Sequence, residues 1–211
     1  MLNKIGIYAN SSPYGLGRRD PESPEEWISS TIDIALSILM HRNETKKNYG
    51  TKEFQTNELI TRELLGRNIW KYSEAFGKFQ GCPFWSVKAY DFYISRKKSS
   101  SISIKDMSNN LRHEHTYPQR LLIEKMKKLK NPTLKDIEEL FDKYAIATIV
   151  TKEENKLLNS KEVGLRVKTI SDENIWLRYN NEKIIIKIKK NPLKNRFYEF
   201  HLEKMNEAKV F

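Results

Sequence analysis

The stretch AIATIVTKEENKLL, residues 145–158, decides the fold. Its first six residues are apolar or β-branched, a pattern that predicts a buried strand. Thr151 and Glu154 follow with the Ser/Thr-x-x-Glu spacing of a capping box, so a helix is expected to begin at once. A strand that runs directly into a capped helix indicates a mixed α+β fold.

Helical patterns dominate the sequence on the N-terminal side of this strand. Ser23, Pro24 and two glutamates form a typical helix start. A second helix is expected from near Thr56 and a third from Ser86, which would serve as its cap. Two more helices are expected over residues 118–130 and, capped by Thr133, before the buried strand. A possible short strand is predicted at Ser101 to Ile104.

The last third of the chain has a different pattern. NIWLRYNNEKIIIKIKK, residues 174–190, alternates about Asn180-Asn181 and predicts a β-hairpin. In its second half Ile184, Ile186 and Ile188 face away from Ile185 and the lysines. These patterns predict three regions: a mainly helical N-terminal region (1–98), a middle region that contains the strand-to-helix unit (99–165) and a C-terminal hairpin extension (166–211).

The stretch LRHEHTYPQRL, residues 111–121, carries the chemistry. A histidine near neutral pKa can take a proton from water, and a glutamate is a hard oxygen ligand for Mg²⁺ or Mn²⁺. On an extended segment Glu114 and His115 point to opposite sides, but on a loop just after a strand they could converge near one phosphate. His113 and His115 could equally be surface or capping residues before the helix that starts at Pro118.

Glu114-His115-Thr116-Tyr117-Pro118, followed by the strand-to-helix unit, resembles the HNH, or ββα-metal, endonucleases. The segments GCPFWS, LRHEHTYP, VTKEEN and WLRY together are similar to a restriction-enzyme-like subset of that family. The resemblance implies that residues 99–165 form a catalytic ββα-metal core with inserted helices. It leaves the helical region 1–98 for DNA recognition or dimerisation. It also implies that His115 activates water while Glu114 and Asn155 hold a Mg²⁺ or Mn²⁺ ion. The middle asparagine of the family motif has no clear counterpart, and Asn131 is the nearest candidate.

The charge of the chain favours a polyanionic partner. Lys and Arg number 38 against 27 Asp and Glu, a formal net charge of +11. Double-stranded DNA is the expected partner, and a basic surface kept for solubility is the alternative. The candidate DNA contacts are Arg18, Arg19, Arg96, Lys97, Lys98, Lys152 and Lys156.

These observations predict a divalent-metal-dependent DNA endonuclease, most simply a type II restriction enzyme. Such an enzyme would act as a homodimer, with its N-terminal helices as the dimer surface and a cognate methyltransferase as genetic partner. The alternatives are a non-catalytic nucleic-acid-binding protein with a degenerate HNH scaffold and an HNH nuclease toxin. No apolar run approaches the roughly 18 residues that span a bilayer, so a cytoplasmic protein is expected. The single cysteine, Cys82, excludes an intramolecular disulfide.

Overall fold

The computed structural model describes residues 24–46, 49–79, 81–99, 104–160, 171–181, 184–191 and 197–211. Their contacts define two compact units. The helical unit comprises the described parts of Arg19–Ala75 and Tyr117–Ile146, and the sheet unit those of Phe76–Thr116 and Ala147–Phe211. This division differs from the expected boundaries at residues 98 and 165, because each unit is assembled from segments far apart in the chain.

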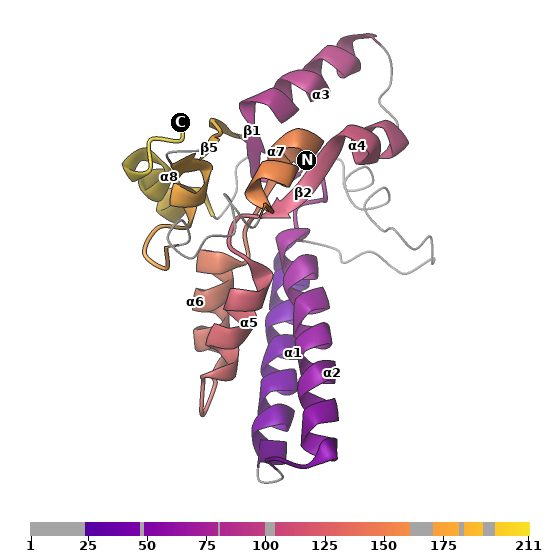
Figure 1. Ribbon diagram of the computed structural model, residues 1–211, viewed down its shortest axis with the longest axis vertical. Coiled ribbons are helices and arrows are strands. Elements are labelled where there is room, and N and C mark those ends of the chain that lie inside the picture. The colour runs from indigo at the N-terminus through magenta and orange to yellow at the C-terminus, as the bar shows by residue number, and fades with distance from the viewer. Residues whose placement is uncertain are drawn as a thin grey trace. The chain divides into compact units, whose positions relative to one another are not determined.

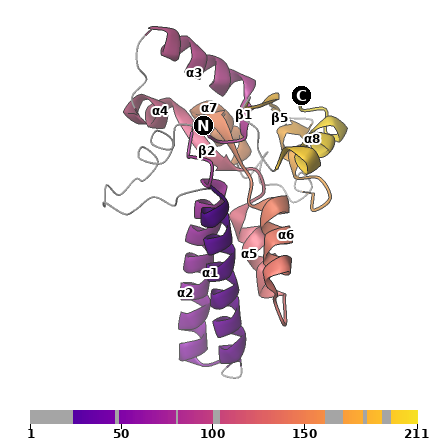
Figure 2. The same cartoon turned by 180° about the vertical axis from the view of Figure 1, so that it is seen from behind.

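The helical unit consists of α1 (Pro24–Thr45), α2 (Lys52–Ser73), α5 (Gln119–Lys127) and α6 (Leu134–Tyr144). Helices α1 and α2 run side by side as a long pair (Figures 1 and 2), and α1 also packs on α6 and α2 on α5. The second helix begins earlier than Thr56, because the Thr51 hydroxyl accepts a hydrogen bond from the Phe54 amide and caps it. Thr133 caps α6 in a full capping box, as predicted.

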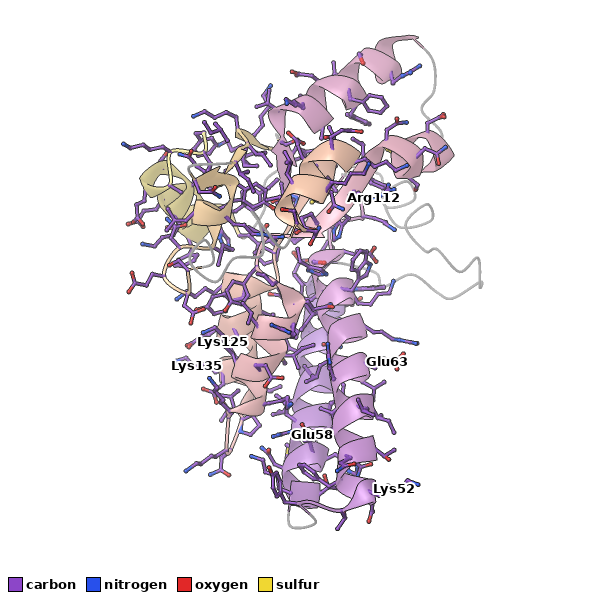
Figure 3. All side chains as sticks on the ribbon, viewed as in Figure 1. Lys52, Glu58, Glu63, Arg112, Lys125 and Lys135 are labelled. Carbon is purple, nitrogen blue, oxygen red and sulfur yellow. The ribbon has the colours of Figure 1, made fainter. Side chains whose placement is uncertain are left out.

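Partly buried polar contacts link the helices of this unit to one another. Glu58 on α2 forms ion pairs with Arg42 on α1 and with Lys127 on α5 (Figure 3 labels Glu58). Arg42 also donates to the Lys127 carbonyl at 3.1 Å, and the Asn43 amide donates to the Leu129 and Lys130 carbonyls at 3.0 Å. Burial tends to raise the pKa of Glu58, but Lys127 and Arg42 outweigh it and the pKa is lowered.

The sheet unit is built on four strands in the order β2-β3-β1-β6. These are β1 (Phe84–Ser86), β2 (Leu111–His115), β3 (Ala147–Thr151) and β6 (Ile188–Lys190). Strand β3 pairs antiparallel with β2 and parallel with β1, and β1 pairs antiparallel with β6. The helices are α3 (Val87–Ser99), α4 (Ile104–Asn110), α7 (Lys152–Leu158) and α8 (Tyr198–Glu207). The expected α+β class is therefore confirmed.

One apolar cluster packs against β1, β2 and β3. It contains Phe79, Cys82, Trp85, Ala89, Met107, Leu111, Ala147 and Ile149. Gly81 allows the loop before β1 to pass close to the backbone, since a Cβ there would lie 1.1 Å from the Phe76 carbonyl oxygen. Cys82 is buried, and its thiol lies 3.4 Å from the Ala147 carbonyl oxygen.

The C-terminal hairpin forms, but with different limits. Residues Ile175–Tyr179 make a 3-10 helix, η3, and the paired strands are only β4 (Asn180–Asn181) and β5 (Ile184–Ile185). The expected first strand is wrong, because the Asn174 side chain caps η3 by accepting from the Trp176 amide at 3.0 Å. The expected alternation is confirmed, since Ile184, Ile186 and Ile188 are buried while Ile185 is exposed.

Two further expectations concern the connector and the membrane. Ile104 begins α4 instead of ending a strand, and residues 101–103 lie outside the described residues. Among the helices that the structure describes, none combines the length and apolar character needed to cross a bilayer.

Candidate functional site between strand β2 and helix α7

Strands β2 and β3 and helix α7 form one antiparallel ββα arrangement, with α7 packed on both strands (Figure 1). The capping box predicted from sequence starts the helix: the Glu154 amide donates to the Thr151 hydroxyl at 3.2 Å and the Thr151 amide donates to Glu154 at 2.9 Å. The Ser86 hydroxyl donates to the same carboxylate oxygen at 2.6 Å and accepts from the Ala89 amide at the start of α3. Glu154 is therefore a structural residue that joins α7 to β1 and α3.

Glu114 lies on the β2 face that α7 covers. Its Oε1 is 2.7 Å from Arg178 Nη1, and its Oε2 is 3.4 Å from the amide nitrogen of Asn159. The carboxylate is largely buried. Burial raises the pKa of Glu114, and Arg178 and Asn159 offset part of that rise.

Half-buried Asn155 on α7 and exposed Asn159, which caps the end of this helix, lie one helical turn apart. The Asn159 amide nitrogen is 3.0 Å from Asn155 Oδ1 and bridges it to Glu114. The structure therefore brings the predicted pair Glu114 and Asn155 to one place. Asn159 was not predicted as a site residue, although its i+4 spacing from Asn155 places both amides on one helix face.

The 3-10 helix η3 supplies the remaining polar groups of the site. The Arg178 guanidinium also donates to the carbonyls of His115, at 2.9 Å, and Leu158, at 2.7 Å. Tyr179 is buried beside it, and burial followed by the Glu114 charge raises the pKa of its hydroxyl, which stays protonated. The Thr116 and Thr148 hydroxyls share a hydrogen bond of 2.9 Å on the same face. Arg178 is the residue that links η3 to both β2 and α7.

His115 does not share the face of Glu114. Across the β2–β3 ladder Glu114 opposes Thr148, while His115 opposes Ala147 and His113 opposes Ile149. Directly opposed residues in a sheet share a face, so both imidazoles lie on the side of the apolar cluster. Both histidines belong to β2 itself, so the convergence of Glu114 and His115 that a loop would allow does not occur.

The environment of His115 makes it a neutral imidazole. Both of its ring nitrogens are shielded from solvent, although the residue as a whole is only half-buried. Burial, with a smaller contribution from the Arg178 charge, lowers the pKa of His115 to about 4. At neutral pH His115 is therefore in the form that can accept a proton, but it is a weak base.

The candidate DNA contacts have different placements. Lys152 is half-buried and Lys156 exposed on α7, and exposed Arg96 on α3 lies 5.6 Å from the centre of the Phe92 ring. Lys97 and Lys98 belong to α3, but their side chains lie outside what the structure describes, and Arg18 and Arg19 lie outside the described residues altogether.

The donor chemistry of the site suits a hard cation. Mg²⁺ in proteins is usually held by one or two carboxylates together with water and substrate phosphates. Glu114 offers one carboxylate and Asn155 one amide oxygen, whereas Asn159 directs its amide nitrogen at both. The Asn159 oxygen would join them as a ligand only when this amide turns over. Within the described part of the chain, His, Cys, Asp and Glu form no cluster of three or more that could hold a metal. A cation here would therefore depend on the two amides and on a bound phosphate.

Comparison with known proteins adds no relative: no family model, no curated protein and no solved structure matches the chain. The site is thus defined by its own geometry, a buried carboxylate on β2 that faces two amides on α7 and an arginine from η3.

Proposed function

We propose that this chain is a divalent-metal-dependent DNA endonuclease that hydrolyses phosphodiester bonds at the site between β2 and α7. The observation that carries the proposal is the contact of Asn159 with both Asn155 and Glu114 within one ββα arrangement. Glu114, Asn155 and Asn159 would hold Mg²⁺ or Mn²⁺. Such a cation supplies the positive charge that the attacked phosphate and the leaving oxygen require.

The proposed proton acceptor is His115. Its neutral state at physiological pH is the state that a general base requires. Because its ring nitrogens are shielded and lie on the other face of β2, the proposal requires this last residue of the strand to turn outward when DNA binds. Catalytic contacts of a general base often form only when the substrate binds.

DNA as substrate follows from the charge of the chain. The net charge of +11 favours a polyanion, and exposed Lys156 follows Asn155 directly on α7. A restriction enzyme that acts as a cytoplasmic homodimer, with a cognate methyltransferase encoded nearby, is the most specific form of this proposal. Exposed Leu59, Ile60 and Leu64 on α2 support the proposed dimer surface, with fractional exposures of 67%, 50% and 46%. Glu63 projects from the same helix (Figure 3).

A second candidate is a non-catalytic nucleic-acid-binding protein that retains the ββα scaffold. The Arg178–Glu114 ion pair favours it, because a guanidinium already neutralises the one carboxylate of the site. A metal ion would then have little charge to bind.

Incubation of supercoiled plasmid with the protein and Mg²⁺ or Mn²⁺ separates the two candidates. The endonuclease nicks or linearises the plasmid, and the Glu114→Gln variant does not. A binding protein retards the plasmid in a gel but leaves it intact with either metal. Discrete fragments support restriction, whereas a smear or cleavage of RNA supports a nuclease toxin.

A further inference from the structure

One buried arginine joins three segments of the sheet unit. The Arg178 side chain is 2% exposed, and its contacts reach Glu114 and His115 on β2 and Leu158 at the end of α7. Nη1 contacts the Glu114 carboxylate and donates to the His115 carbonyl, and Nη2 donates to the Leu158 carbonyl. These acceptors lie between 20 and 64 positions from Arg178 in the chain.

The Arg178 guanidinium bridges the two elements that carry the candidate site, because it contacts Glu114 on β2 and the Leu158 carbonyl at the end of α7. Holding Glu114 Oε1 leaves Oε2 directed at Asn159. Holding the Leu158 carbonyl fixes the end of α7, next to Asn159 and one turn from Asn155. A planar guanidinium with several fixed donors can satisfy three acceptors at once, which the single ammonium of a lysine cannot do with the same geometry.

The position of Arg178 is itself set by the contacts of η3 with α8 and β1. Asn174 caps η3 and donates to the Lys204 carbonyl of α8 at 2.7 Å. The Trp176 indole donates to His201 Nδ1 at 3.3 Å and packs edge-on against Phe84 of β1. The guanidinium is therefore held by an anchored segment, so that it can act as a rigid support.

We infer that Arg178 is a positioning residue: it holds Glu114 against Asn159, and through Asn159 near Asn155, in the geometry that binds the metal. The segment that carries Arg178, η3, is thereby part of the functional unit. This inference rests on the proposed metal site. Arg178 is not a catalytic residue, since it touches strand, helix and ligand groups of the protein and not the reacting atoms. Removing Arg178 also removes a positive charge beside Glu114, so the inference requires that the loss of positioning outweighs this gain in negative charge. Loss of a supporting residue of a metal ligand costs on the order of 10- to 100-fold in metal affinity.

The test compares Arg178→Gln and Arg178→Lys with Arg42→Gln, in full-length protein. Arg42 is a matched control, because it is also buried, ion-paired to a glutamate and bonded to a carbonyl, but belongs to the helical unit. Mn²⁺ binding is measured by electron paramagnetic resonance, and amide hydrogen exchange is followed without metal. Circular dichroism confirms that each variant is folded.

Arg178→Gln is expected to weaken Mn²⁺ binding roughly 10- to 100-fold and to speed exchange in β2 and α7, with partial recovery in Arg178→Lys. Arg42→Gln is expected to lower the melting temperature without changing Mn²⁺ affinity. Folded Arg178→Gln with wild-type exchange in β2 and α7, or with wild-type Mn²⁺ affinity, overturns the inference. If the wild-type protein binds no Mn²⁺, the proposed metal site is wrong. Hydrogen exchange in β2 and α7 is measured without metal, so it still shows whether Arg178 holds these two elements in place.

Discussion

The Ser86 hydroxyl donates a hydrogen bond of 2.6 Å to the Glu154 carboxylate, although 68 positions separate the two residues in the chain. This contact fastens the start of α7, which carries two of the candidate metal ligands, to the junction of β1 and α3. The orientation of the candidate site therefore depends on a buried capping residue and not only on the ligands themselves.

Replacement of Glu154 by alanine is expected to destabilise the protein by about 2–3 kcal/mol, because it removes a cap and leaves buried donors without their acceptor. Asp136→Ala provides the control, since Asp136 forms the equivalent capping box on α6 at an exposed position. That change is expected to cost less than Glu154→Ala, because the hydrogen bonds of Asp136 are exposed to solvent. Urea unfolding measures both, and equal losses would show that the contact with Ser86 contributes nothing.

Asn159→Ala is expected to weaken Mn²⁺ binding about tenfold or more, because it removes one proposed oxygen ligand and the bridge between Asn155 and Glu114. Asn110→Ala is a close control: Asn110 at the end of α4 likewise donates to the carbonyl four residues earlier, at 2.9 Å compared with 3.0 Å for Asn159. Calorimetric titration with Mn²⁺ distinguishes them. Identical affinities in the two variants would remove Asn159 from the site.

His115 predicts a pH dependence of stability. Its folded pKa of about 4 lies below the ordinary value of 6.5, because the site is buried and Arg178 is close. Between these values the unfolded chain binds a proton that the folded chain does not, so stability is lost as the pH falls from 6.5 towards 4. The loss due to this group is at most about 3 kcal/mol.

His115→Gln removes this titration and is expected to flatten the stability curve over that pH range. Urea unfolding at several pH values, with a chelator present, measures wild type and variant. Curves that stay parallel from pH 7 to pH 4 would mean that the imidazole is not held neutral in the folded protein.

The proposed dimer surface on α2 can be tested with a charged substitution. Ile60→Glu places a carboxylate on the exposed apolar group of Leu59, Ile60 and Leu64, twice in a symmetric dimer, and is expected to raise the dimer Kd at least about tenfold. Leu134→Glu is the control, because Leu134 is comparably exposed, at 49%, on α6. Sedimentation velocity over a range of concentrations reports the association. A wild-type protein that remains monomeric throughout contradicts the proposed surface.

Local patterns predicted much of the sheet unit correctly. The apolar run before Thr151 became β3, the capping box started α7, Ser86 capped α3, and alternation placed Ile184, Ile186 and Ile188 inside. Each of these features depends on residues only a few positions apart. A period or a cap is visible in the sequence without knowledge of the tertiary structure.

The long-range features were not predictable in this way. The pairing of β1 with β3 and β6 joins segments more than 60 positions apart. Arg178 looked like one position of an alternating strand, yet Asn174 turns that segment into a 3-10 helix and directs the guanidinium into the core. A buried charge is not recognisable from sequence, since its partners come from other parts of the chain.

Cleavage of supercoiled plasmid is the most direct test of the proposed endonuclease. Wild-type protein with Mg²⁺ or Mn²⁺ is expected to convert the plasmid to nicked or linear forms, while Glu114→Gln and His115→Ala, purified in parallel, leave it supercoiled. Plasmid that stays intact with wild type and either metal, or that is cut equally by the wild type and the Glu114→Gln variant, would contradict the account.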